Sequence, residues 1–564
     1  MLVYPLAANS RPDFSQANPQ QAAAVLAIVK DVLGGGIVGG SLMGPAGSGK
    51  TTTLTWIAKE LLRLAGPGSV MFATPTHKSR KVLSYGLNLG LKAQVVTTAR
   101  IIGKGTYVDF DLNPFEDPAY KEVIKKAQKF RTAEETRSVR VVFFDESSMI
   151  SHSDAFLLGA FCGEAGVKPY FVGDKHQLPP VNEKKQDNFD DKPDPDVPTT
   201  FGRMCKQFIE ADGQKFALTT VERHKGAVLH FASEIVKNWD QEACFPFASS
   251  SFGDSLIDVT YSEDEWLNLF VDFVRKHKSN ARAIFWTHRR IASAGAYLRR
   301  KLYGQAADEG WVVGELIYFP SYSTPVWYDP KSRSLKRVMK ESKKPGGKPY
   351  VEPIYSATEC EVLESEFFDL DHLIGVHEHN APKSGHVKLE VRLKGRYQQI
   401  TVQPLNTNLS IKALVPAKNC KIAAEHRKQT FEDKNRFFRN GWLDRKRDED
   451  FGQNVFKTFK DCDVEVYPLN TMTVHASQGS TFSHVFIHSD VLSNKDKEEH
   501  NAMIYVAATR AKSSARFLNP SCNQRFSLRP RSSEQCQQSH QPSRRNPSRL
   551  ADTGLPDLLR FSLQ

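Results

Sequence analysis

The sequence predicts an α/β fold in which mostly parallel sheets carry helices on both faces. Short apolar runs that read as buried strands alternate with helical patterns or insertions, at residues 37–43, 70–73, 94–97, 139–144 and 169–172. A second set begins near residues 283–286 and resumes at residues 485–487. Because alternating strands and helices form parallel sheets, we expect two α/β domains, the second split by a long insertion.

Length and composition limit the possible classes of protein. The 564 residues are enough for roughly three or four domains. A net charge of +12 suits a polyanionic partner such as nucleic acid. The eight cysteines include no C-x-x-C pair, which argues against a zinc ribbon or a disulfide scaffold and favours a reducing cytoplasm. No run of about 18 apolar residues is present, so we expect no membrane partner.

The segment after the first apolar run fits the pattern G-x-x-x-x-G-K-[ST] of a phosphate-binding loop. A helical pattern follows it, with apolar residues at Leu54, Ile57 and Leu61. The loop amides and the helix N-terminus should then face an anion. We expect Lys50 to reach the β- and γ-phosphates of ATP and Thr51 to hold Mg²⁺. The predicted nucleotide-binding residues of this segment are Gly44, Pro45, Ala46, Gly47, Ser48, Gly49, Lys50, Thr51 and Thr52.

A pair of carboxylates ends the apolar run at residues 139–144. Alone, such a pair is usually a solvated strand end. Beside a phosphate loop it has two uses in a nucleoside triphosphatase. Asp145 would bind Mg²⁺, and Glu146 would orient and deprotonate the attacking water.

Residues 173–180 read Gly-Asp-Lys-His-Gln-Leu-Pro-Pro and resemble motif III of the superfamily 1 DNA helicases. In that family the glutamine contacts the γ-phosphate and links it to the DNA site, which implies this role for Gln177. The family's other motifs are matched in the same order along the chain. Because all the motifs occur in the family's order, the resemblance is much more specific than a match to any single motif.

On the nucleotide side, residues 18–25 resemble the Q motif, whose glutamine reads adenine, and Gln21 fits it best. Residues 218–223 resemble motif IV, which implies a phosphate contact for Arg223. Residues 505–511 resemble motif VI, which implies that Arg510 is the arginine finger. The resemblance therefore predicts Lys50, Glu146, Gln177, Arg510 and Arg223 as the catalytic set, with Gly479 of motif V as a further nucleotide contact.

On the DNA side, residues 74–77 resemble motif Ia, residues 98–100 occupy the place of motif Ib, and residues 473–479 resemble motif V. The implied DNA contacts are Pro75, Thr76, His77, Thr98, Arg100 and His475. Two positions depart from the family pattern. Many relatives have lysine where this chain has Ala476 and histidine where it has Arg100, so affinity for the strand and stepping could differ from theirs.

The match is best with the RecD-like branch of superfamily 1, close to the Dda-type helicases of T-even phages, because residues 311–316 resemble the segment that opens their accessory domain. The resemblance implies two RecA-like P-loop NTPase domains, each with an insertion, the second insertion partly a small β barrel. A strand-separating pin would use Tyr107, Phe110 or Phe115, although these aromatics could equally form a small core of their own. The expected boundaries are 1–102 and 139–215 for the first RecA-like domain, 103–138 for the pin, 216–316 and 464–516 for the second RecA-like domain, 317–463 for an SH3-like barrel with a charged helical arm, and 517–564 for a disordered basic tail.

The implied function is that of an ATP-dependent DNA helicase that moves 5′→3′ along single-stranded DNA and separates duplex or displaces bound protein. Its cofactors would be ATP and Mg²⁺, and its partners single-stranded and fork DNA together with a single-strand-binding protein. It would work as a monomer in a phage-infected or bacterial cytoplasm, in DNA replication or recombination. Two alternatives stay open: an NTPase that acts on RNA or bound protein with little unwinding, and a catalytically silent nucleic-acid-binding module.

Overall fold

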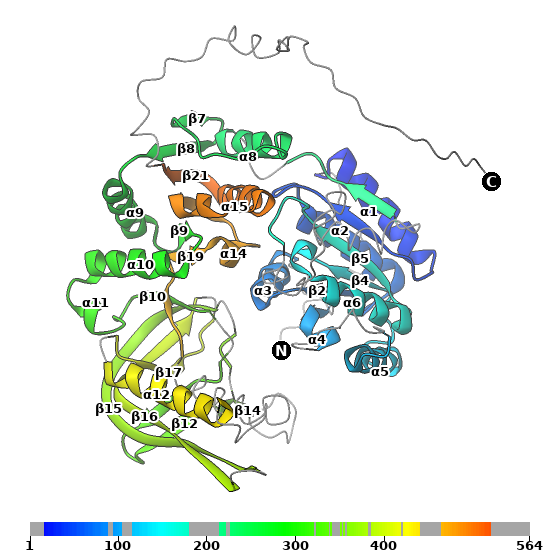
Figure 1. Ribbon diagram of the computed structural model, residues 1–564. Coiled ribbons are helices and arrows are strands. Elements are labelled where there is room, and N and C mark those ends of the chain that lie inside the picture. Colours follow the sequence, from blue (N-terminus) through cyan, green and yellow to red (C-terminus); the bar gives the residue numbers. More distant parts are fainter. Residues whose placement is uncertain are drawn as a thin grey trace, which may run out of the picture. The chain divides into compact units, whose positions relative to one another are not determined.

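The computed structural model describes residues 16–87, 94–103, 115–179, 214–221, 226–320, 323–337, 339–340, 350–351, 353–355, 358–381, 385–405, 407–418, 421–439 and 464–519. Two six-stranded sheets and one five-stranded sheet organise these residues. Figure 1 shows the helices that accompany each sheet. No helix among the described residues is both long enough and apolar enough to cross a bilayer.

The first sheet is parallel throughout and has the order β3-β2-β4-β5-β1-β6. Successive residues of its strands point to opposite faces, so Phe72 and Met71 belong to different core clusters. Its strands are β1 Gly40–Met43, β2 Val70–Thr74, β3 Gln94–Thr97, β4 Val141–Phe144, β5 Lys168–Gly173 and β6 Gln214–Ala217.

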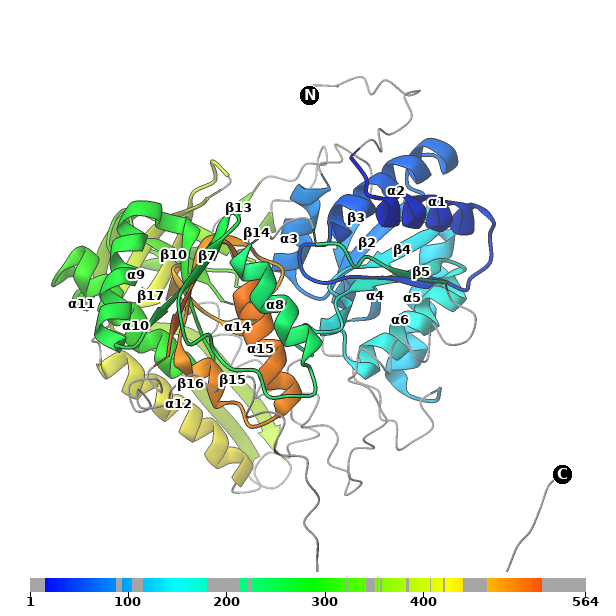
Figure 2. The same ribbon diagram turned by 90° about the horizontal axis from the view of Figure 1, so that it is seen from above.

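Helices cover both faces of this sheet, three to a face (Figure 2). One face is covered by α1 Pro19–Leu33, α2 Lys50–Ala65 and α3 His77–Gly86. The other face is covered by α4 Thr98–Ile102, α5 Pro118–Thr132 and α6 His152–Ala165, with the short 3₁₀ turn η1 Ser147–Met149 ahead of α6.

Local sequence explains where these elements begin. Helix α1 starts with a capping box, in which Asn18 accepts a hydrogen bond from the Gln21 amide and Gln21 accepts one from the Asn18 amide. Strand β1 begins at Gly40, three residues later than the apolar run predicts. The difference has a physical cause: Ile37 and Val38 are 53% and 50% exposed, so they extend the apolar run without entering the sheet.

The second sheet has the order β19-β9-β20-β21-β8-β7, parallel except for the antiparallel edge strand β7. It joins strands from before and after the long insertion, because β9 lies between β19 and β20. Its strands are β7 Ser250–Phe252, β8 Ser255–Thr260, β9 Ala281–Phe285, β19 Thr471–Thr473, β20 Phe482–Ile487 and β21 Ala511–Leu518.

Helices again cover both faces of this sheet. Helices α8 Ala227–Lys237 and α15 Lys497–Thr509 share one core cluster with it, and α9 Glu263–His277 and α10 His288–Tyr303 share the other. Short turns complete the domain: η3 Lys278–Asn280, α11 Ala306–Glu309, α14 Val474–Ser477 and η4 Ser489–Ser493. The predicted α/β class with two RecA-like domains is confirmed.

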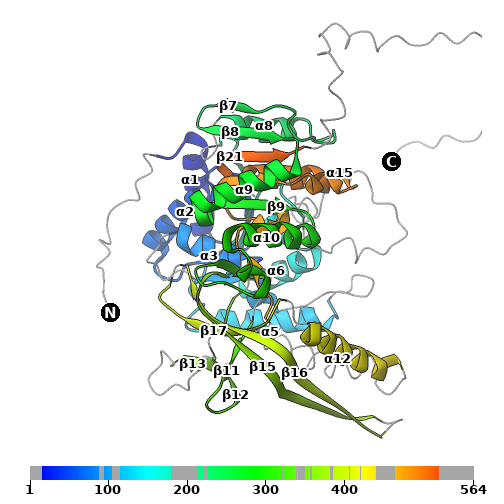
Figure 3. The same ribbon diagram turned by 90° about the vertical axis from the view of Figure 1, so that its left-hand side faces the viewer.

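The insertion forms an antiparallel sheet with the order β17-β16-β15-β10-β18, dominated by the long β15–β16 hairpin (Figure 3). Its strands are β10 Leu316–Phe319, β15 Thr358–Ala381, β16 Gly385–Pro404, β17 Ile411–Pro416 and β18 Tyr467–Pro468. The described strands pair in one open order, so the closed barrel stays a prediction. Beside them are the hairpins β11 Val326–Asp329 with β12 Ser334–Arg337 and β13 Met339–Lys340 with β14 Tyr350–Val351, and the charged helix α12 Lys421–Arg439, which packs on β16.

The predicted pin needs a correction. Helix α5 buries Val123 and Ala127 in the core of the first domain, so the second half of residues 103–138 is part of that domain. Phe115 meets Tyr120 and Phe156 edge-on, at 5.3 and 5.7 Å between ring centroids, and thus joins a local aromatic cluster. Residues 104–114, with Tyr107 and Phe110, lie outside the described residues, so a pin there stays a prediction.

The expected start of the tail at residue 517 needs a correction, because it falls inside a strand. Strand β21 runs to Leu518, past the expected boundary at residue 517. Residues 520–564 lie outside the described residues.

Candidate active site

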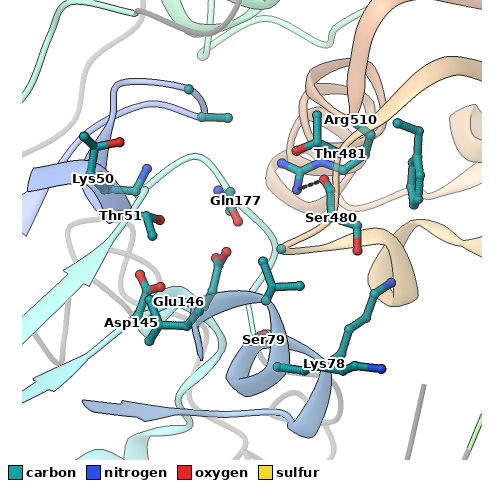
Figure 4. Close-up of a pocket in the computed structure, with 18 of the residues that line it drawn as sticks. Lys50, Thr51, Lys78, Ser79, Asp145, Glu146, Gln177, Ser480, Thr481 and Arg510 are labelled. Atoms are coloured by element: carbon teal, nitrogen blue, oxygen red, sulfur yellow. Dashed lines mark hydrogen bonds between the residues drawn. The ribbon is translucent and has the colours of Figure 1, made fainter. Parts of the chain in front are cut away.

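A cavity of about 430 Å³ takes one wall from the first sheet's loops and the other from the second domain. Figure 4 shows Lys50, Thr51, Asp145 and Glu146 on one side, Ser480, Thr481 and Arg510 on the other, and Gln177 between them. The lining residues are Ala46, Gly47, Gly49, Lys50, Thr51, Thr52, Lys78, Ser79, Lys81, Val82, Leu83, Asp145, Glu146, Gln177, Glu359, Gly479, Ser480, Thr481, Phe482 and Arg510.

The phosphate-loop pattern lies between β1 and α2, as a strand–loop–helix unit requires. Gly47 and Gly49 have φ values of 84° and 82°, which side-chain-bearing residues rarely adopt. The Lys50 ammonium donates to the Gly44 and Pro45 carbonyls, at 2.7 and 3.0 Å. Its charge is thus held at the loop, where a phosphate oxygen could replace either carbonyl.

Gln21, predicted to contact adenine, has hydrogen-bond partners within the first domain in this structure, and its adenine contact stays a prediction. Its side chain is 3% exposed, and both ends of its amide are hydrogen-bonded within the first domain. The oxygen accepts from the Asn18 amide at 3.1 Å, and the nitrogen donates to the Ser48 carbonyl at 3.2 Å. A Cβ on Gly49 would lie 2.4 Å from the same nitrogen. This geometry makes Gln21 a support for the phosphate loop, outside the cavity.

The two acids follow β4 directly. Burial, and after it the charge of Glu146, raise the pKa of the Asp145 carboxyl to about 7, although Lys50 acts to lower it. Glu146 has a φ of 54°, in the left-handed region that non-glycine residues seldom occupy outside constrained sites. The backbone therefore aims two neighbouring carboxylates into one cavity at an energetic cost.

Gln177 belongs to the turn that follows β5. Gln177 is 7% exposed, and its buried Oε1 has no hydrogen-bond partner among the described residues. Since buried polar atoms are normally paired, this oxygen marks a place where a donor or a bound group would be accommodated. Its backbone amide donates to the Asp174 carbonyl at 3.2 Å, which fixes the turn.

Arg510 ends α15 and is 4% exposed. Its guanidinium donates to the Ser480 and Val506 carbonyls and to the Thr509 hydroxyl, at 3.1, 3.0 and 3.1 Å. Gly479 approaches the acid pair, because a Cβ added to it would lie 3.5 Å from Glu146 Oε1. The second domain thus presents a fixed cation and a close backbone to the carboxylates of the first.

Besides Lys50 and Arg510, the cavity holds a basic group, Lys78, that the sequence analysis missed. Lys78 donates to the Ala476 carbonyl at 2.5 Å and so joins the two domains. Burial lowers the pKa of Lys78 to about 8; Glu359 opposes this shift, and Arg282 and Arg510 add to it. The signal was local, since Lys78 directly follows the motif Ia match, whereas nothing near Glu359 indicated that the inserted sheet reaches this cavity.

The predicted DNA contacts lie outside the cavity at strand ends. Strands β2 and β3 pair in parallel with Thr74 opposite Thr97, so residues 75–77 and 98–100 emerge side by side. Thr76 accepts a hydrogen bond from the Ser79 amide at 3.0 Å and opens α3, while Arg100 is exposed. In the second domain His475 follows β19, and burial lowers its pKa. Strand binding by these residues stays a prediction.

Two oxygen groups in the cavity fit a Mg²⁺ ion. The Thr51 hydroxyl and the Asp145 carboxylate line the same wall, and oxygen is the ligand type that Mg²⁺ takes. Among the described residues no three His, Cys, Asp or Glu side chains form a metal site of their own. The remaining ligands of such an ion would therefore come from phosphate and water.

The remaining predicted residues fall into two groups. Gly44, Pro45 and Ser48 form the back of the phosphate loop without lining the cavity, although the buried Ser48 hydroxyl has no hydrogen-bond partner. Arg223 lies outside the described residues. The structure thus brings most of the predicted ATP-side residues to one cavity and adds Lys78, Glu359 and residues 480–482.

Two protein families match the chain. Residues 16–187 match an AAA domain, and residues 469–518 match the UvrD-like helicase C-terminal domain. These segments contain the phosphate loop with both acids and the turn with Arg510, respectively.

Two relatives match most of the chain. An uncharacterized protein of Acanthamoeba polyphaga mimivirus is 21% identical over 502 residues, covering 85% of this chain and 94% of that protein. The ATP-dependent DNA helicase dda of Enterobacteria phage T4 is 22% identical over 483 residues, covering 84% and 92%. The chain is also similar to the solved structure of Pif1 helicase from Bacteroides in complex with ADP-AlF3 and ssDNA, which covers 88% of this chain and 92% of that chain at 14% identity and a TM-score of 0.41.

Proposed function

We propose that this chain, a superfamily 1 helicase related to the Dda helicase, hydrolyses ATP to move along single-stranded DNA and to separate duplex or displace bound protein. One observation carries the proposal. A single cavity collects the phosphate loop, a carboxylate pair and Gln177 from one parallel-sheet domain and Arg510 from the other. A cleft built in this way can tie hydrolysis to relative movement of the two domains.

Hydrolysis in this cavity would depend on positioning and charge. Lys50 would exchange its bonds to the loop carbonyls for phosphate oxygens. Glu146 would hold the attacking water and accept its proton, and Gln177 would use its unpaired oxygen to orient that water. Arg510 would face the developing charge on the transferred phosphoryl group. A Mg²⁺ ion held by Thr51 and Asp145 would neutralise charge on the β- and γ-phosphates.

Grip on the strand would come from both domains. Residues 75–77 and 98–100 emerge together at the ends of β2 and β3, and His475 emerges after β19. Helix α3, which begins at His77, also supplies Lys78 to the ATP cavity. Closing and opening of the cleft would therefore alter how tightly the DNA backbone is held. Binding to the backbone tolerates any sequence and weakens as the salt concentration rises. The family resemblance supports 5′→3′ movement.

The biological setting is proposed from resemblance alone. We infer a monomeric motor that acts on single-stranded and fork DNA in a phage-infected or bacterial cytoplasm. It would serve DNA replication or recombination beside a single-strand-binding protein.

The test is Mg²⁺-dependent ATPase activity with and without single-stranded DNA. We expect strong stimulation that Lys50→Ala reduces by about 10²–10³-fold, because one contact to the reacting phosphates is lost. Lys59→Ala is the matched control, since Lys59 is an exposed lysine on the same helix. Activation by RNA but not by DNA would sink the DNA assignment and support the RNA alternative.

Polarity and unwinding need a second substrate set. Duplexes with only a 5′ or only a 3′ single-stranded tail separate the two directions of movement. Unwinding that requires the 5′ tail supports the proposal. DNA-stimulated ATPase without unwinding of either substrate would favour a motor that displaces bound protein.

A further inference from the structure

A tyrosine of the second domain reaches into the phosphate loop of the first. Tyr505 lies on α15 and is 2% exposed. Its hydroxyl accepts a hydrogen bond from the Ala46 amide at 3.0 Å and donates one to Asp174 Oδ2 at 2.8 Å. Ala46 belongs to the phosphate loop, and Asp174 begins the turn that carries Gln177. One hydroxyl therefore joins two nucleotide-side segments to the other domain.

The hydroxyl is held in the form that both bonds need. Burial, and after it the charge of Asp174, raise the pKa of Tyr505 well above its usual range, so the group stays protonated and can donate. The net effect of the groups around Asp174 is to lower its pKa, because hydrogen bonds from His176 and Tyr505 and the charge of Lys50 outweigh burial. A protonated phenol facing a charged carboxylate is a strong, directional contact.

The same helix turn holds the arginine. The Thr509 hydroxyl donates to the Tyr505 carbonyl at 2.8 Å and accepts from Arg510 Nη2 at 3.1 Å. The path from the Ala46 amide to the guanidinium thus runs through one residue and one turn of α15. Because this path is short and hydrogen-bonded, a movement of the phosphate loop would be passed on to Arg510.

Apolar packing keeps this contact dry. Ala46 and Leu178 of the first domain belong to the same buried cluster as Tyr505 and the other core residues of the second domain. The Gln478 side chain adds a hydrogen bond to the Leu178 carbonyl at 3.4 Å. With water excluded, loss of the hydroxyl would leave both the Ala46 amide and the Asp174 carboxylate short of a partner.

We propose that Tyr505 is a positioning residue that couples the phosphate loop and the Gln177 turn to Arg510. The proposal rests on the proposed ATPase function. ATP would still bind to the loop of a variant without the hydroxyl, because Lys50 and the loop backbone are unchanged. The arginine would no longer be held at one distance from the reacting phosphate, so the chemical step would slow.

The test uses Tyr505→Phe in the full chain, which keeps the ring and removes only the hydroxyl. Affinity is measured with a fluorescent ATP analogue, and the chemical step by single-turnover ATP hydrolysis with and without single-stranded DNA. We expect affinity within about 2-fold of wild type and hydrolysis slower by about 10- to 100-fold, as for a misplaced catalytic group. Tyr170→Phe is the matched control, because Tyr170 is a buried tyrosine whose hydroxyl donates to Asp31 in the same domain, away from the cavity.

A double variant tests the coupling itself. Asp174→Asn alone should slow hydrolysis, and Tyr505→Phe with Asp174→Asn should be no slower than the slower single variant, because both disturb the same hydrogen bond between Tyr505 and Asp174. Normal hydrolysis by Tyr505→Phe, a loss confined to nucleotide affinity, or fully additive losses would each overturn the proposal. The comparison also holds for basal hydrolysis, so failure of DNA to stimulate wild type would count against the proposed motor alone.

Discussion

Gln21 offers a direct test of whether a glutamine ahead of the phosphate loop reads the base or supports the loop. The resemblance implies that Gln21 contacts adenine, whereas its side-chain amide is hydrogen-bonded to Asn18 and Ser48. Gln21→Ala removes both bonds and leaves the cavity lining unchanged. We expect this variant to lose activity equally with ATP and GTP, because the damage is to the loop that both nucleotides share.

The magnitude follows from the two hydrogen bonds. A buried bond between neutral groups contributes about 1 kcal/mol net. The bond to the Ser48 carbonyl acts on the loop, so its loss should lower kcat/KM by about 5-fold for either nucleotide. The bond from the Asn18 amide acts on the start of α1, so its loss should reduce the free energy of unfolding by about 1 kcal/mol.

The assay is steady-state hydrolysis of ATP and of GTP by the variant and by wild type, at saturating single-stranded DNA. Gln128→Ala is the control, because Gln128 is a glutamine of the same domain whose side-chain amide donates to Glu164 on the surface. A fall in ATP hydrolysis with GTP hydrolysis unchanged would refute the supporting role and indicate that Gln21 contacts the adenine base.

Two further predictions concern buried charges. Glu315→Gln should lower the free energy of unfolding by about 3–5 kcal/mol in urea denaturation, because it leaves the buried Arg299 guanidinium without its carboxylate. Asp272→Asn, which breaks an exposed ion pair, is the control and should lower it by at most about 0.5 kcal/mol. Equal losses in the two variants would contradict this reasoning. The Lys78 pKa of about 8 in the folded protein lies below the value near 10.4 in the unfolded chain. The charged Lys78 side chain therefore destabilises the fold fully below pH 8, and this effect vanishes as the pH rises past 10. Lys78→Met removes this penalty but also loses the hydrogen bond to Ala476, and the penalty is reduced because Lys78 is partly exposed. The variant should therefore be more stable than wild type by about 1–2 kcal/mol at pH 7 and by less at pH 9.5. A variant less stable than wild type at pH 7 would contradict the lowered pKa of Lys78.

Much of the fold could be predicted because its signals are local. Buried parallel strands are short apolar runs, and the predicted run at residues 94–97 coincides with β3. The strand–loop–helix unit at the phosphate loop is contiguous in sequence as well. Local signals fail where an apolar run continues outside a sheet, as at Ile37 and Val38, since periodicity does not report exposure.

The site was predictable to the same extent and for the same reason. Lys50, Asp145 and Gln177 each belong to a short run whose pattern has chemical meaning. Glu359 does not, because its place in the cavity arises from a contact with Lys78, more than 100 positions away. Tyr505 opens the run that resembles motif VI, but nothing in that run predicts its hydrogen bond with Ala46. Such contacts form only when the two domains and the inserted sheet pack together, and no local sequence pattern predicts that packing.

Helix α3 would connect the proposed ATP cavity to expected DNA contacts that lie outside it. Its start follows residues 75–77, the expected DNA contact, while Lys78 and Lys81 on it line the ATP cavity. The inserted sheet leans on the same helix, because Tyr355 lies against the His77 ring at 5.3 Å and Glu359 reaches the cavity. We therefore expect a change at the phosphates that moves Lys78 to act also on residues 75–77 and on the contact to the insertion. Coupling between hydrolysis and strand grip then requires no long pathway, since both act on the first turn of one helix.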